Sequence, residues 1–241
     1  MRCTQTGATA AVDTPEAAAI ERALEETGWG PLTHILCTHH HADHTGGNVE
    51  LKRRYSGCVV VGPRADAARI PALDVAVAEG EPLAVGEARV EVLDTPGHTR
   101  GHCAYYFPAA QALFCGDTLF SLGCGRLFEG TPEQMCASLD KLRALPGGTR
   151  VFCAHEYTAA NARFALTLEP GNAALRARAA EVEALRAAVP PRPTVPSTLA
   201  QELAANPFLR AQSAELQAAV GLPGASPVAV FAETRRRKDV F

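Results

Sequence analysis

Short apolar runs that end in Gly, Pro, Asp or His recur through the first two thirds of the chain, and this pattern is typical of β-strands. The runs cover residues 33–38, 58–62, 89–93, 102–107, 112–115 and 150–154. Stretches with apolar residues at helical spacing lie between some of them. Residues 15–27 carry Ile20 and Leu24 on one face and stop at Gly28, and residues 132–145 form a second such stretch. The alternation of the two patterns predicts a layered α/β domain.

Beyond the last of these strands the strand pattern stops, and segments rich in Ala, Leu and Arg follow with helical spacing. These segments are residues 158–168, 172–189, 198–205 and 207–219. A proline-rich stretch, 190–196, interrupts them, and Thr198 with Gln201 forms a capping-box pattern that restarts a helix. The sequence therefore predicts an α/β domain over residues 1–157 and an all-helical domain over residues 158–241.

Composition places the chain among ordinary globular proteins. Its 241 residues are 47% hydrophobic and 20% charged, which is enough apolar material for a core without disulfide bonds. The eight cysteines are scattered, with no CxxC pair, and several lie inside apolar runs. This placement predicts buried, reduced thiols rather than disulfides or metal ligands.

The charge balance gives no reason to expect a polyanionic partner. A formal net charge of −3 provides no general attraction to nucleic acids or anionic membranes. No apolar run approaches the ~18 residues of a membrane span, and residues 1–13 lack the apolar centre of a secretory signal. We therefore expect a cytoplasmic monomer without nucleic-acid or membrane partners.

Seven side chains that can bind a metal ion stand at the ends of the predicted strands. They are His39, His41, Asp43, His44, His98, Asp117 and His155. Alternate side chains of an extended loop share a side, so we expect His39 and His41 to converge on one ion while His40 points away and has a structural role. Any one of these motifs alone is typical of a turn, but four of them, each just past an apolar strand, indicate a metal site.

One short segment cannot place four groups around a single ion and leave a position for substrate, so we expect two adjacent ions. We assign His39, His41 and His98 to one ion, Asp43, His44 and His155 to the other, and Asp117 to both as a bridge. Two dications bring about +4 and two carboxylates remove about 2, so the site remains electropositive even with a shared hydroxide. Such a site lowers the pKa of bound water toward ~7 and stabilises an oxyanion, which predicts hydrolysis with Asp43 and Asp117 as the catalytic carboxylates.

The His/Asp donor set accepts zinc, iron or manganese according to supply. We expect two divalent ions, with zinc ahead of iron and manganese. His102, one turn past His98, is a candidate hydrogen-bond partner for one of the metal-binding side chains. A histidine in such a position more often has a purely structural role.

The motif over residues 38–48, Thr-His-His-His-Ala-Asp-His-Thr-Gly-Gly-Asn, together with the later His, Asp and His, resembles the metallo-β-lactamase superfamily. Further motifs resemble, more narrowly, glyoxalase II, the hydroxyacylglutathione hydrolases. These motifs cover residues 116–120, 123–126, 155–158, 206–210 and 235–239, so the resemblance spans nearly the whole chain. It implies an αββα sandwich followed by a helical domain that holds glutathione.

The resemblance also implies a substrate and the residues that bind it. Arg126, Tyr157, Arg235 and Lys238 match family positions that contact the glutathione moiety. The implied reaction is hydrolysis of S-D-lactoylglutathione or a similar S-(2-hydroxyacyl)glutathione thioester to a 2-hydroxy acid and glutathione, a step in methylglyoxal detoxification. Cations on a helical lid could fix a glutathione carboxylate while the thioester carbonyl reaches the metals.

The sequence departs from the family pattern at three places. Phe128 stands where the family usually has Tyr, and Arg126 stands where Lys is common, so we expect altered affinity for the peptide part of the substrate. Family members begin with a strand hairpin of about twenty or more residues, whereas this chain begins partway through it. We expect residues 9–13 to form a strand with an exposed edge, and therefore either a start codon upstream or a less soluble product.

Two other functions fit part of this pattern. A glutathione persulfide dioxygenase would hold a single iron through His41, His98 and Asp117. Another thioesterase of the same fold would use the same two ions on a different acyl carrier. The complete second ligand set and the long basic tail favour the glutathione thioester hydrolase, and metal analysis with an oxygen-consumption assay would separate it from the dioxygenase.

Overall fold

The computed structural model describes residues 1–241 and divides into two units. Unit 1 comprises Met1–Asp94 with Thr99–Gly116, and unit 2 comprises Thr95–His98 with Asp117–Phe241. All six predicted strands form, with ends shifted by at most two residues. No helix is long and apolar enough to cross a membrane. All eight cysteines are free and six of them are buried, as the apolar context of the thiols predicts.

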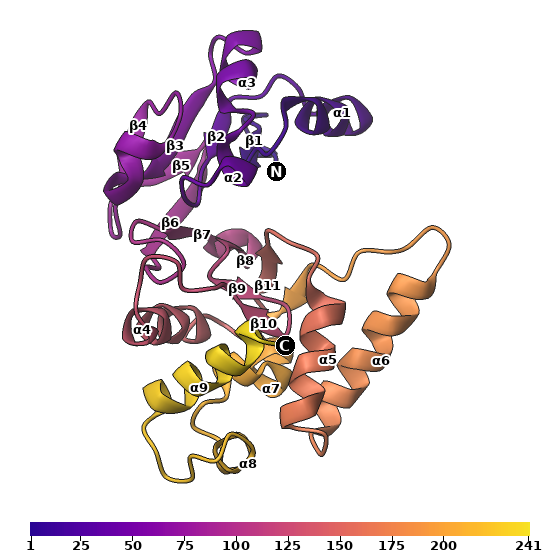
Figure 1. Ribbon diagram of the computed structural model, residues 1–241. Coiled ribbons are helices and arrows are strands. Elements are labelled where there is room, and N and C mark those ends of the chain that lie inside the picture. Colours follow the sequence, from indigo (N-terminus) through magenta and orange to yellow (C-terminus); the bar gives the residue numbers. More distant parts are fainter. The chain divides into compact units, whose positions relative to one another are not determined.

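A parallel sheet in unit 1 carries the first group of predicted ligands at its edge. It is formed by β1 (Ala10–Val12), β2 (His34–Leu36), β3 (Val59–Pro63) and β4 (Val75–Val77), in that order. Ile35 of β2 and Val60 of β3 belong to one buried apolar cluster with Leu24 of α1 (Ala17–Thr27) and Leu51 of α3 (Asn48–Arg54). Both helices are labelled in Figure 1. The carboxyl ends of parallel strands meet at one edge of a sheet, so the loops after β1 and β2 lie together there.

The second set of strands in unit 1 is antiparallel. In hydrogen-bonded order it runs β8 (Ala112–Gly116), β7 (Cys103–Phe107), β6 (Ala88–Asp94) and β5 (Leu83–Val85). The buried Tyr105 hydroxyl donates to the Cys37 carbonyl at 2.7 Å, and the Cys103 amide donates to the Thr38 carbonyl at 2.9 Å. These two bonds fix the backbone of the loop after β2, where the histidines begin.

Residues before β1 turn back along its outer edge. The Met1 amino group donates to the Ala10 carbonyl at 2.9 Å, and the Ala10 amide donates to the Met1 carbonyl at 3.0 Å. The backbones of Arg2 and Thr9 form an isolated antiparallel β-bridge. This pairing covers part of the edge that the sequence predicts to be exposed.

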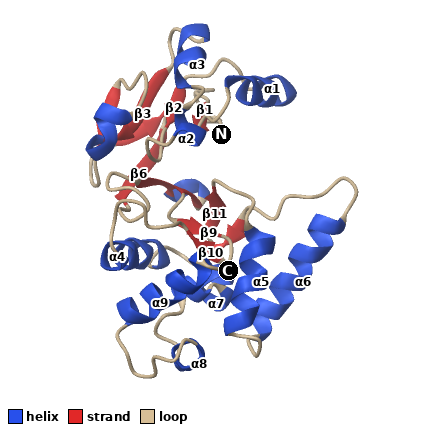
Figure 2. Cartoon of the chain, in the orientation of Figure 1, coloured by secondary structure: helices blue, strands red, loops and turns tan.

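Unit 2 is mainly helical (Figure 2). Its helices are α4 (Pro132–Arg143), α5 (Thr158–Leu168), α6 (Ala173–Ala187), α7 (Leu199–Ala205), α8 (Ala214–Ala219) and α9 (Pro227–Asp239), and its strands are β9 (Leu119–Phe120), β10 (Gly123–Cys124), β11 (Arg150–Cys153) and β12 (Ser197–Thr198). Helices α5 and α6 lie side by side (Figure 1). The predicted capping box at the start of α7 is confirmed, because Thr198 accepts from the Gln201 amide and Gln201 accepts from the Thr198 amide.

Three features of unit 2 differ from the sequence prediction. A strand, β12, occurs in the segment predicted to be all helical, and it pairs antiparallel with β11. The helix predicted over residues 207–219 is divided, because Asn206 caps a short 3-10 turn and Ser213 caps α8 separately. Helix α9 lies in the region predicted to be helical, although no separate helix was predicted there; it begins at the cap Ser226 with Pro227 in its first turn.

A buried polar cluster holds the β9–β10 hairpin, which directly follows Asp117. The Asn206 side-chain amide donates to the carbonyls of Phe120 and Gly123, both at 3.0 Å, and to Glu202. Glu202 also accepts from the Leu122 amide at 2.8 Å. Burial raises the pKa of Glu202. The turn of the hairpin is therefore bonded to α7 from several directions.

Candidate metal centre

Asp13, directly after β1, organises the ligand loop that follows β2. Its carboxylate accepts the Thr38 amide at 2.8 Å, the Thr38 hydroxyl at 2.9 Å and the Nδ1–H of His44 at 2.7 Å. Because the Thr38 hydroxyl uses its only hydrogen on Asp13, it must accept from the Nδ1 of His39, which lies 3.0 Å away. Both histidines therefore carry their proton on Nδ1 and keep an Nε2 lone pair for a metal ion.

Unit 1 places its predicted ligands in two close pairs. The Nε2 of His39 lies 3.1 Å from the Nδ1 of His41. Asp43 Oδ2 lies 3.6 Å from the Nε2 of His44. His40 is directed elsewhere, since its Nδ1 bonds the buried Asp66 at 2.8 Å, in keeping with its predicted structural role.

Unit 2 places Asp117 between two imidazoles. The Nε2 of His98 lies 3.5 Å from Asp117 Oδ2, and the Nε2 of His155 lies 3.5 Å from Asp117 Oδ1. The Nδ1–H of His98 donates to the Arg126 carbonyl at 2.9 Å, which again leaves Nε2 as the lone-pair nitrogen. Asp117 is only 7% exposed, so little water competes for its two oxygens.

These spacings fit metal ligation better than direct hydrogen bonding. Two donors at ~2.1 Å from one tetrahedral ion lie about 3.4 Å apart, whereas N–H···O bonds cluster near ~2.9 Å. Three of the four pairs have separations of 3.5 to 3.6 Å. Since the two oxygens of Asp117 face different histidines, one carboxylate can serve two ions.

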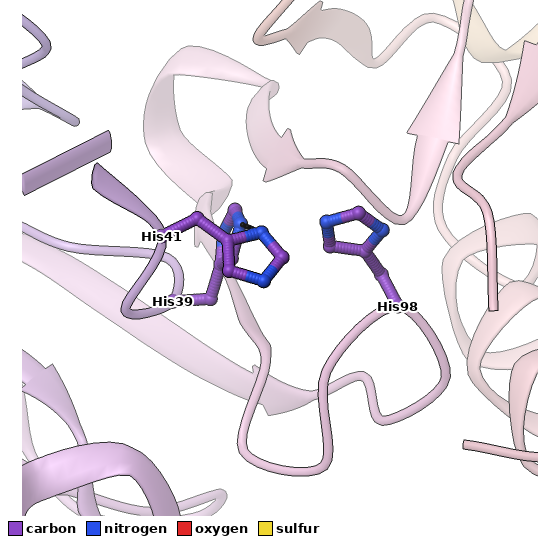
Figure 3. A group of neighbouring side chains, drawn as sticks. All are labelled: His39, His41 and His98. Atoms are coloured by element: carbon purple, nitrogen blue, oxygen red, sulfur yellow. Dashed lines mark hydrogen bonds between the residues drawn. The ribbon is translucent and has the colours of Figure 1, made fainter. Parts of the chain in front are cut away.

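The donor chemistry of the predicted ligands is compatible with a binuclear metal site. The groups that could hold an ion are His39, His41 and His98; His39, His44 and Asp117; and Asp43, His44 and His155. Figure 3 shows the imidazole rings of His39 and His41, both from the loop after β2, together with the imidazole ring of His98. Imidazole and carboxylate donors suit zinc, iron and manganese alike.

A cavity of about 430 Å³ opens in unit 2 beside two of these ligands. His98 and Asp117 line it, and so do the four residues predicted to bind substrate: Arg126, Tyr157, Arg235 and Lys238. Its walls are otherwise largely apolar, with Phe120, Phe128 and Phe241 among them. Phe128 packs edge-on to His98 at 5.1 Å, and Tyr157 stacks on His155 at 4.9 Å. The predicted substrate residues and two predicted ligands therefore share one cavity.

The cations of this cavity have different partners. Arg235 is buried, pairs with Asp239 at 2.9 Å and donates to the Cys124 carbonyl at 2.9 Å, so much of its hydrogen-bonding capacity is used within the protein. Arg126 approaches Asp239 only to 3.7 Å. Lys238 lies over two aromatic rings. Arg126 and Lys238 are thus better placed than Arg235 to meet an anionic ligand.

Asp13 is the supporting residue that sequence analysis left out of the site. An acidic residue at the carboxyl end of a strand in a parallel sheet is the signal that could have identified it. We expect Asp13→Asn to lower metal affinity and kcat/KM by about 10- to 100-fold, because an amide has a single acceptor oxygen and cannot accept all three of the hydrogen bonds that the carboxylate accepts. Metal titration and steady-state kinetics would measure both effects.

Asp140→Asn is the matched control for this change, because Asp140 is exposed on α4 and pairs only with Arg143. It should leave metal affinity and activity unchanged. Wild-type metal affinity in Asp13→Asn would show that Asp13 does not support the ligands.

The fold has counterparts among known protein families and solved structures. Residues 10–155 match the metallo-beta-lactamase superfamily. The crystal structure of ETHE1 from Myxococcus xanthus is 25% identical, aligns over 100% of this chain and 92% of its own, and gives a TM-score of 0.65. Fold and donor set together define an enzyme of the metallo-β-lactamase superfamily, of the predicted α/β class with a C-terminal helical region.

The helical region and the curated relatives narrow this class. Residues 156–241 match the hydroxyacylglutathione hydrolase C-terminus. A hydroxyacylglutathione hydrolase of Methylococcus capsulatus is 61% identical over 98% of this chain and 90% of its own length, and one of Rhodospirillum rubrum is 58% identical over 100% and 93%. The chain belongs to the hydroxyacylglutathione hydrolase family, glyoxalase II.

Proposed function

We propose that this enzyme hydrolyses S-(2-hydroxyacyl)glutathione thioesters such as S-D-lactoylglutathione to a 2-hydroxy acid and glutathione, within methylglyoxal detoxification. The observation that carries the proposal is the unit 2 cavity, in which the ligands His98 and Asp117 share one space with Arg126 and Lys238. Glutathione has two carboxylates, and a cavity with cations beside a metal centre suits a thioester that ends in them.

In this proposal two divalent ions, zinc first, with iron and manganese as alternatives, occupy the donor set. His39, His41 and His98 would hold one ion, Asp43, His44 and His155 the other, and Asp117 both. Bound ions of this kind polarise a carbonyl and lower the pKa of water toward ~7. Asp13 and the Arg126 carbonyl keep the imidazoles in the tautomer that presents Nε2.

The residues of the cavity have the task of orienting the substrate. Arg126 and Lys238 would bind a glutathione carboxylate, and Arg235 would add positive charge while it holds β10 through Cys124. Tyr157 presents its ring beside His155, and Phe120 and Phe128 form apolar walls that limit water near the thioester. Binding remote from the reacting carbonyl lowers the entropy that must be lost during reaction.

We further propose that the functional division lies near residue 157 and that the enzyme acts as a cytoplasmic monomer. Eight free cysteines support a reducing compartment. The net charge of −3 supports the absence of nucleic-acid and anionic membrane partners.

The experiment that tests the function is a paired assay on purified enzyme of measured metal content. Free thiol is recorded with S-D-lactoylglutathione, and oxygen consumption is recorded with glutathione persulfide. We expect two metal ions per chain, thiol release and no oxygen consumption. One iron per chain with oxygen consumption would instead establish the dioxygenase, and thiol release only from other acyl carriers would establish a different thioesterase.

A further inference from the structure

Lys238, in the last turn of α9, lies beside two aromatic rings at the wall of the unit 2 cavity. Its Nζ is 5.2 Å from the ring centre of Phe164 on α5 and 5.0 Å from that of Phe241, the C-terminal residue. The two rings contact each other edge-to-face at 5.4 Å. The two distances from the Lys238 Nζ to the ring centres are within the ~6 Å over which a ring face attracts a cation.

No carboxylate pairs with this ammonium group. Asp239, its neighbour in the chain, pairs with Arg235 at 2.9 Å and approaches Arg126 to 3.7 Å. Burial, followed by the charges of Arg235, Arg163 and Arg126, lowers the pKa of Lys238. Apart from the charge of Asp239, which opposes this shift, the π faces of the two rings are the attractive groups that the protein offers to the Lys238 ammonium.

A lysine side chain has four rotatable bonds, so an unpaired ammonium at a cavity wall samples many positions. Attraction to both rings, whose planes are inclined at 64°, restricts it to the space beside them. The ammonium is then held in place before an anion arrives, which reduces the ordering that binding must bring about.

We infer that Phe241, together with Phe164, is a positioning residue that holds the Lys238 ammonium in the cavity for a carboxylate of the ligand. The inference rests on the proposed function, because it identifies the ligand class as a glutathione derivative with free carboxylates. It assigns Phe241 an effect through Lys238 rather than through the reacting groups.

Phe241 allows a cleaner test than Phe164. Phe164 is buried and stacks on Phe208, so its removal would disturb the packing of α5. The Phe241 residue is 60% exposed, so its ring can be removed with little loss of core. Val240, its exposed neighbour, provides a matched control in Val240→Ala.

The test measures binding of S-hexylglutathione, which is not a thioester, by calorimetry on the metal-loaded enzyme, and kinetics with S-D-lactoylglutathione. We expect Phe241→Ala to raise Kd and KM about fivefold, which corresponds to about 1 kcal/mol at 25 °C. The kcat should change less than twofold. Phe241→Trp should restore affinity, since its ring also attracts a cation, whereas Phe241→Leu should not, and Val240→Ala should match the wild type.

A double-mutant cycle with Lys238→Met separates positioning from direct contact. If Phe241 acts through Lys238, the double variant should bind no more weakly than Lys238→Met alone. Additive losses would overturn the inference in favour of direct contact between Phe241 and ligand. Unchanged affinity in Phe241→Ala, or equal losses with Leu and Trp at this position, would also overturn it.

The two proposals fail in different ways. Because affinity for S-hexylglutathione is measured without turnover, wild-type enzyme that binds it but hydrolyses no glutathione thioester would refute the proposed function and leave the cycle as a valid test. Wild-type enzyme that does not bind S-hexylglutathione would overturn the inference directly, whatever the hydrolysis assay shows.

Discussion

Complete removal of bound metal is expected to reduce thioester hydrolysis by at least about 10³-fold, because the chain itself supplies no activated nucleophile in the cavity. Cys124 is the one thiol that lines the cavity, and burial raises its pKa to about 11. It is therefore protonated at pH 7 and a poor nucleophile. The enzyme should be dialysed against a chelator, its metal content measured and its activity compared with the untreated protein.

Addition of up to two equivalents of zinc should restore the activity in proportion to the fraction of metal sites that are occupied. The melting temperature should also rise with added metal, because a ligand that binds only the folded state stabilises it. Iron and manganese should restore activity as well if the donor set accepts them as proposed. Full thioesterase activity in protein with no measurable metal would contradict the proposed mechanism.

Asp117→Asn is expected to lower kcat by about 10²- to 10³-fold and to reduce the metal content from two ions to about one. Each oxygen of Asp117 faces a different imidazole at 3.5 Å, whereas an amide provides one oxygen and no negative charge. A site that loses the shared anion holds two dications less tightly and places more positive charge close together. Metal analysis and kcat with S-D-lactoylglutathione would measure both changes.

Two further variants limit the interpretation of this result. Asp117→Glu keeps the charge but moves the carboxylate by one methylene, so its metal content and kcat should lie between those of the wild type and Asp117→Asn. Exposed Asp140→Asn should retain both values. Asp117→Asn with normal metal content and undiminished kcat would exclude Asp117 as the shared ligand.

The strands and the candidate donor residues could be predicted from the sequence because both are local features. Four of the six apolar runs are followed within a few residues by a predicted His or Asp donor, and the parallel sheet places the loops after β1 and β2 at one edge. The bond between Asp13 and His44, 31 residues apart, depends on tertiary structure and has no local pattern.

The helical region was less predictable for the same reason. Helix α9 has polar residues from Thr234 to Asp239, and these are placed by contacts with distant segments such as Cys124. Arg235 therefore resembles a substrate residue in sequence, while the structure shows a buried guanidinium that bonds the protein itself. The aromatic partners of Lys238 come from α5 and from the chain end, which no spacing rule connects.

The side-chain amide of Asn206 has a consequence for how the family could change during evolution. It bonds the backbone of Phe120 and Gly123, at both ends of the turn that follows Asp117. Exchange of the last third of the chain for a foreign module would remove this support from the residues beside Asp117. Recombination to acquire a new acyl carrier is therefore constrained to retain the contact between the end of α7 and this turn.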